Sequence, residues 1–167
     1  MRGWTPGYKP STMVRMDYQV ERVDVAERPT AVVRAVIPGE EIPAFLGRAY
    51  GEVLEVIAAQ HLTPAGMPFG CYVPTEDGME VEAGFPCSGP VSPAGRVVPS
   101  SFPAGPAVRV LHKGPYDGVP AAHAAATQWL AGNGWKAAGP PWEEYLDGPG
   151  VAEPRTVVYV PCRAVQP

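Results

Sequence analysis

Residues 68–74 have the sequence PFGCYVP and residues 141–146 have the sequence PWEEYL, and the pattern these two segments share decides the predicted fold. Each contains an aromatic residue, two further residues and then a tyrosine: Phe69 and Tyr72 in the first segment, Trp142 and Tyr145 in the second. Both are short, contain aromatic residues and lie between prolines or glycines, which is typical of strands. We interpret them as equivalent strands of two repeated halves.

The elements around these segments follow the same order twice. Apolar residues at three- and four-residue spacing predict a helix at 42–60, and a Gly-Asn-Gly stop ends a second helix at 119–131. Pro43 and Pro120 lie in the first turns, where a missing N–H costs nothing. The predicted strands of the first half are 31–37, 68–74 and 79–85, and those of the second are 107–112, 141–146 and 155–161; a further strand is expected at 18–25.

Three more matches follow in the same order. Pro29 corresponds to Pro106, Pro43-Ala44 to Pro120-Ala121, and Pro86-Cys87 to Pro161-Cys162. The sequence therefore predicts an α+β fold made by pseudo-two-fold duplication of a β-α-β-β unit, with antiparallel sheets and two main helices. We expect an N-terminal extension at 1–16 and a single domain at 17–167, with one half at about 17–90 and the other at about 95–163.

Composition excludes several classes of function. The net charge of −4 and a pI near 5.4 argue against direct binding of nucleic acid, which needs a basic surface. No apolar run is long enough to span a membrane, and the N-terminus lacks the apolar core of a signal peptide. Three cysteines without CxxC spacing favour reduced thiols in the cytoplasm. The scattered His61, His112 and His123 predict no metal site, and we expect no cofactor.

Three segments carry a resemblance to a known family: His112–Tyr116 (HKGPY), Trp142–Leu146 (WEEYL) and Arg155–Pro161 (RTVVYVP). Over residues 17–163 the chain resembles the GyrI-like (gyrase-inhibitor-like) effector-binding domains of bacteria, which occur alone or fused to DNA-binding modules. The resemblance implies a cavity between the two halves, in which aromatic residues and a buried glutamate hold apolar, often cationic ligands. That glutamate is Glu143. The chain has no helix-turn-helix segment, so direct transcriptional control is not expected.

Glu143 and Tyr145 are two residues apart in a predicted strand and therefore project from the same face. Tyr72 and Gly70 are their counterparts in the first half, and Gly70 leaves room for a flat ligand. The alternative for Glu143 is a solvated strand residue, and for each aromatic it is ordinary core packing. The candidate ligand-binding residues are Glu143, Tyr145, Trp142, Tyr72, Phe69, Gly70, Tyr50 and Phe85.

Three functions stay open. The first is binding of planar, apolar or cationic drug-like molecules, for sequestration or detoxification. The second is hydrolysis of a strained, cyclopropane-type DNA-alkylating antibiotic in the same pocket, as some standalone members of the family imply. Glu143 and Tyr145 would then be the acid/base groups. The third is a protein-interaction module of the gyrase-inhibitor type, supported only by the acidic net charge. Whether the chain is a monomer or a dimer is equally open.

Overall fold

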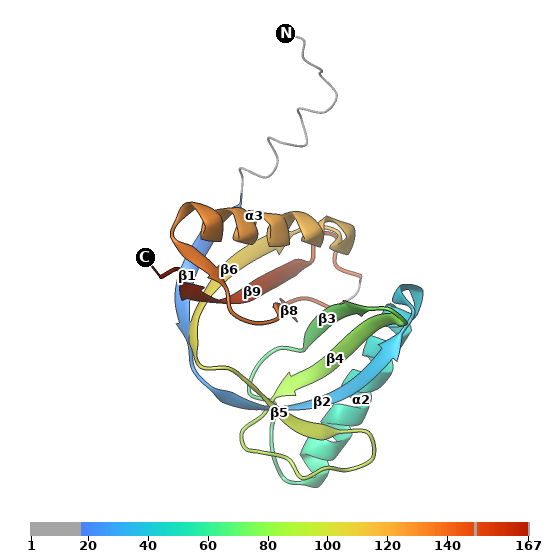
Figure 1. Ribbon diagram of the computed structural model, residues 1–167. Coiled ribbons are helices and arrows are strands. Elements are labelled where there is room, and N and C mark those ends of the chain that lie inside the picture. The colour runs from blue at the N-terminus through green and yellow to red at the C-terminus, as the bar shows by residue number, and fades with distance from the viewer. Residues whose placement is uncertain (1–17, 149, 167) are drawn as a thin grey trace.

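Two helices pack against one curled antiparallel sheet in the computed structural model, which describes residues 18–148 and 150–166 (Figure 1). The extension expected at 1–16 lies outside these residues. The strands are β1 (Val20–Val25), β2 (Arg28–Ile37), β3 (Phe69–Thr75), β4 (Gly78–Pro86), β5 (Val98–Phe102), β6 (Gly105–Lys113), β7 (Trp135–Ala137), β8 (Trp142–Tyr145) and β9 (Arg155–Ala164). The helices are α2 (Ile42–Ala59) and α3 (Val119–Gly132), each preceded by a 3-10 turn, η1 (Gly39–Glu41) and η2 (Tyr116–Gly118).

The order of the strands reveals the internal symmetry. They follow one another as β1-β6-β9-β8-β3-β4-β2-β5, with β7 added beside β9. Read outward from the β8–β3 junction in either direction, this order gives equivalent strands, so β2-α2-β3-β4 and β6-α3-β8-β9 are the two copies. The predicted α+β duplication and both helices are confirmed, with helix ends within one residue of those expected.

Two strands, β5 and β7, were not predicted. β5 and the predicted strand β1 each pair with the copy that they do not adjoin in the chain. β5 precedes the second copy in the chain but pairs with β2 of the first, and β1 precedes the first copy but pairs with β6 of the second. Residues 98–102 (VPSSF) lack apolar alternation and contain a proline, so only the pairing with β2 makes them a strand. β7 has three residues, too few to show a period.

Both helices cover the same face of the sheet, as the strand register shows. Val33, Ala83, Gly70, Glu143, Val158 and Val110 are paired in turn across six neighbouring strands. Residues paired directly in an antiparallel sheet point to the same face. Val33 and Ala83 belong to the core cluster that includes the buried side chains of α2, and Val110 and Val158 to the one that includes those of α3. Figure 1 shows α2 along β2 and β4, and α3 along β6 and β9. Gly70 and Glu143 lie between these two cores.

Each helix buries one stripe. In α2 the buried residues Phe45, Ala49, Val53 and Ile57 recur every four positions, and in α3 the corresponding residues are mostly alanine. This alanine-rich stripe packs against β6 and β9. In the described part of the chain, no helix is long and apolar enough to cross a membrane.

Two glycines give a matched test of the packing: Gly84 in β4 has no room for a side chain, whereas Gly51 in α2 has. A Cβ on Gly84 would collide with the backbone carbonyl of Ala31 on β2, whereas a Cβ on Gly51 would meet nothing within 4 Å. We expect Gly84→Ala to lower the free energy of unfolding by at least about 2 kcal/mol, because β2 and β4 must separate. Gly51→Ala should raise it by about 0.5–1 kcal/mol through helix propensity. Urea unfolding measures both, and equal effects at the two positions would contradict this packing.

Candidate ligand-binding site

A cavity of 620 Å³ lies between the first turns of the two helices, at the junction of the two halves. Its floor is formed by β3 and β8, and η2 contributes Tyr116 to its wall. The wall is mostly apolar, apart from a few polar side chains that point into the same space. The lining residues are Ile42, Pro43, Leu46, Gly47, Tyr50, Pro68, Tyr72, Tyr116, Val119, Pro120, His123, Glu143, Tyr145, Asp147 and Gly148.

Four of these side chains form a continuous hydrogen-bonded chain. Tyr145 donates its hydroxyl proton to Glu143 Oε1 at 2.8 Å, and the Tyr72 and Tyr145 hydroxyls are 2.7 Å apart. A phenol has one proton, so Tyr72 is the donor to Tyr145. The other carboxylate oxygen, Glu143 Oε2, is 2.8 Å from His123 Nε2. The Glu143 side chain is only 16% exposed, which excludes the alternative of a solvated strand residue.

Gly70 has a specific role in this arrangement. It is paired with Glu143 across the β3–β8 junction, and a Cβ at this position would lie 2.5 Å from the Tyr72 hydroxyl oxygen. The missing side chain therefore lets the Tyr72 ring lie over Gly70 and reach Tyr145. The space that the sequence suggested for a flat ligand is occupied by Tyr72 in this structure.

Three phenols of the cavity, those of Tyr50, Tyr72 and Tyr145, keep their protons at neutral pH. Burial raises the pKa of Tyr50, Tyr72 and Tyr145, and the nearby Glu143 raises it further. Tyr50 donates to the backbone carbonyl oxygen of Phe69 at 3.0 Å, which fixes its ring against the floor. The Tyr116 ring meets the Tyr145 ring edge-on, with centroids 6.0 Å apart. The cavity thus presents neutral aromatic rings around one carboxylate.

A second carboxylate, Asp147, is neutralised at the rim. Arg155 binds both of its oxygens at 2.9 Å, and the guanidinium holds the pKa of Asp147 below its usual range. Glu143 has instead a phenol and an imidazole as partners. Among the described residues, no three His, Cys, Asp or Glu side chains are grouped so that they could hold a metal ion.

The residues proposed from the sequence are distributed over two faces. Glu143, Tyr145, Tyr72 and Tyr50 all lie in the cavity wall, with Gly70 beneath Tyr72. Phe85 lies outside the wall and packs edge-on against Tyr50 at 5.5 Å. Phe69 and Trp142 belong to the opposite face, because each is one residue removed from a cavity residue. Sequence reasoning missed His123, Tyr116 and Asp147, although His123 follows Val119 at one-turn spacing on the same helix face.

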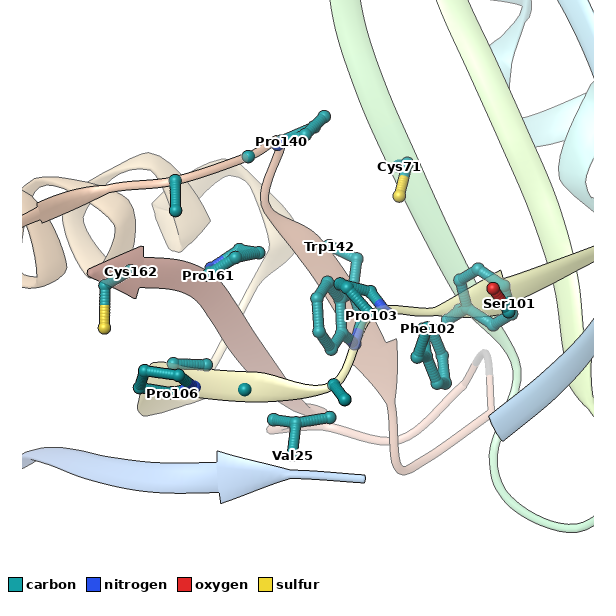
Figure 2. A pocket seen from close by; sticks show the side chains of 16 residues that line it. Val25, Cys71, Ser101, Phe102, Pro103, Pro106, Pro140, Trp142, Pro161 and Cys162 are labelled. Atoms are coloured by element: carbon teal, nitrogen blue, oxygen red, sulfur yellow. The ribbon is translucent and has the colours of Figure 1, made fainter. Parts of the chain in front are cut away.

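Phe69 and Trp142 line a different pocket, of 380 Å³, on that opposite face (Figure 2). Trp142 is stacked between Phe102 and Tyr159, with ring centroids 4.8 and 5.1 Å away. Prolines and the Cys71 thiol complete much of this pocket, and none of the described residues that line it carries a charge. The two pockets therefore share the β3–β8 partition but differ in electrostatic character.

The sequence of the domain and its architecture agree on the family. The model of the GyrI-like small molecule binding domain matches residues 16–163, and the chain belongs to this family. No curated protein matches the chain.

Solved structures show the same fold. The EcmrR C-terminal domain is 27% identical, with a TM-score of 0.74, and the match covers 90% of this chain and 100% of that one. In the EcmrR–DNA complex the identity is also 27% and the TM-score 0.79, over 95% of this chain, which spans 62% of the EcmrR chain. A hydrolase from Listeria innocua (16% identity, TM-score 0.64, 87% and 92% coverage) and SAV2435 bound to tetraphenylphosphonium (14%, 0.62, 89% and 94%) share the fold.

The thiol of Cys71 tests whether β3, which separates the two pockets, is shielded from solvent. Burial raises its pKa to about 12, and Cys87 and Cys162 are also free thiols with raised pKa values. Because only the thiolate reacts, we expect alkylation of all three at pH 8 to be at least about 100-fold slower in the folded protein than in urea. Mass spectrometry after timed iodoacetamide treatment measures the rates. Rapid modification of Cys71 in the folded protein would contradict the buried partition.

Proposed function

We propose that this chain binds planar or bulky apolar organic cations in the cavity between its two halves, with Glu143 as the counter-charge. One observation carries this proposal: the Glu143 carboxylate is largely shielded from water at the junction of two apolar cores and has no guanidinium or ammonium partner within the described residues. A carboxylate removed from water is costly unless a charge compensates it. A cationic ligand supplies that charge and buries its own apolar surface at the same time.

The aromatic wall supports the same class of ligand. The rings of Tyr50, Tyr72, Tyr116 and Tyr145 offer negative faces to a delocalised cation, and such contacts strengthen when water is excluded. Leu46, Val119 and the two helix-starting prolines supply apolar contact without directional demands. Such a wall is expected to select ligands by their positive charge and apolar surface more than by a particular shape. A fold neighbour, SAV2435, was solved with tetraphenylphosphonium, which has this character.

The role that follows is sequestration or detoxification of such molecules in the cytoplasm. The paired phenols favour one further candidate, hydrolytic opening of a strained electrophile in the same cavity. Tyr145 and Glu143 lie side by side in the cavity wall, with the Tyr72 hydroxyl within hydrogen-bond distance of Tyr145. In that mechanism Tyr145 gives up its hydrogen bond to Glu143 and donates its one proton to the oxygen that gains charge, and the freed Glu143 oxygen orients the attacking water. Substrate strain supplies much of the driving force.

Replacing Glu143 tests the counter-charge directly. Glu143→Gln keeps the shape and one hydrogen-bond acceptor but removes the charge, so we expect tetraphenylphosphonium to bind about ten- to a hundred-fold more weakly. The shape-matched anion tetraphenylborate should bind the original protein poorly and gain affinity in the variant. Isothermal titration calorimetry at pH 8 measures both. For a cyclopropane substrate, the same change should lower kcat while substrate binding survives.

Glu144→Gln is the matched control, since Glu144 is the next residue on the same strand and faces Arg28, Arg109 and Tyr159 on the opposite side. It should leave the affinity for both ions unchanged. Equal losses from the two substitutions, or no loss at Glu143, would overturn the assignment of Glu143 as counter-charge.

A further inference from the structure

His123 is the residue nearest to the counter-charge that the proposed function leaves without a role. It lies on α3, one turn after the helix begins, and its Nε2 is 2.8 Å from Glu143 Oε2. The side chain is 30% exposed and lines the cavity, so it is reached by water and by any ligand. Among the described residues of the cavity wall it is the one imidazole, a group that is either a neutral hydrogen-bond donor to a carboxylate or a cation.

We propose that His123 is a specificity-determining residue that competes with cationic ligands for Glu143, so that each cation bound to a protonated site releases a proton. The proposal rests on the proposed function of Glu143. When His123 is neutral, its N–H satisfies one carboxylate oxygen but leaves the negative charge of Glu143 uncompensated. When His123 is protonated, the imidazolium is itself the counter-ion, and a ligand cation meets a site whose net charge is zero.

The other titratable groups that face His123 across the cavity are phenols and carboxylates. Burial raises the pKa values of Tyr50, Tyr72 and Tyr145, so that these three stay neutral. Tyr116 adds a fourth hydroxyl to the wall. Asp147 stays ionised against Arg155. Glu143 itself is the charge that His123 and the ligand share.

A second imidazole, that of His112 near the end of β6, packs against the turn before α3 and must be distinguished from His123. His112 is buried, with Nδ1 2.7 Å from the Tyr18 hydroxyl and Nε2 2.9 Å from the carbonyl oxygen of Pro115. It packs against Gly118 of η2, the turn that carries Tyr116. Protonation of His112 would therefore act on the cavity through η2. A substitution confined to His123 separates the two.

Tetraphenylphosphonium is a suitable probe, because it has no proton to lose and any pH dependence belongs to the protein. The imidazolium form is favoured as the pH falls, and it competes with the ligand for one carboxylate. We therefore expect affinity to fall about tenfold or more between pH 8 and pH 5.5 in the original protein, the size of one charge-assisted contact. Calorimetry at pH 6.5 in two buffers with different ionisation enthalpies should show net proton release on binding.

The decisive variant is His123→Gln, whose amide places a neutral donor close to the position of Nε2. Its affinity at pH 8 serves as its own reference: the ratio of its affinities at pH 8 and pH 5.5 should fall to near one, and it should release no protons on binding. His61→Asn is the control: it removes an exposed histidine with φ of 62°, a conformation that asparagine tolerates, and should keep the full pH dependence. Thermal unfolding of each variant at both pH values reports whether it is folded.

Two outcomes would overturn the proposal while leaving the proposed function intact. In the first, the original protein binds the cation equally at both pH values. In the second, His123→Gln keeps the pH dependence, which assigns it to Glu143 or to His112. Absence of binding at pH 8 in the original protein would instead count against the proposed function itself.

Discussion

The burial of one carboxylate at the junction of two apolar cores is the constraint on which the rest of the site depends. Glu143 stands in a row of directly paired residues in which its neighbours along the sheet are valine, alanine and glycine. Such a charge persists only if hydrogen bonds reach both oxygens. Tyr145 and His123 provide them, and Tyr72 orients Tyr145 in turn. Removing either partner leaves the carboxylate short of a donor in a mostly apolar cavity.

Duplication explains how the fold creates that position and why the position is asymmetric. Each copy covers its own sheet half with one helix, so the β3–β8 junction, where the copies meet, is covered by neither helix and opens into the cavity. Symmetry places Gly70 of one copy opposite Glu143 of the other. A second acid at Gly70 would put two like charges side by side. Glycine instead makes room for Tyr72, which converts a symmetric junction into a site with one charge and a donor chain.

The sequence predicted the architecture better than it predicted the site. Proline-started helices, alternating strands and repeated motifs were enough for the duplication, both helices and the shared face of Glu143 and Tyr145. Strand alternation also implies that Trp142 and Phe69 face away from Glu143 and Tyr145. They were nevertheless included among the candidate ligand-binding residues, because they are aromatic. His123 and Tyr116 come from other elements, and only the packing of α3 and η2 against β8 brings them to the carboxylate. β5 becomes a strand through pairing with the other half, which no local pattern in residues 98–102 reveals.

A crystal of the protein with tetraphenylarsonium shows whether the Glu143 charge selects the ligand, because the arsenic atom marks the position of the positive charge by anomalous scattering. The ligand has a choice between two neighbouring pockets of similar apolar character, and only one contains a carboxylate. We expect an arsenic peak in the cavity of Glu143 and Tyr145, lost in Glu143→Gln crystals under the same conditions. A peak in the uncharged pocket beside Trp142, or one that persists unchanged in the variant, would contradict the claim that the buried charge selects the ligand.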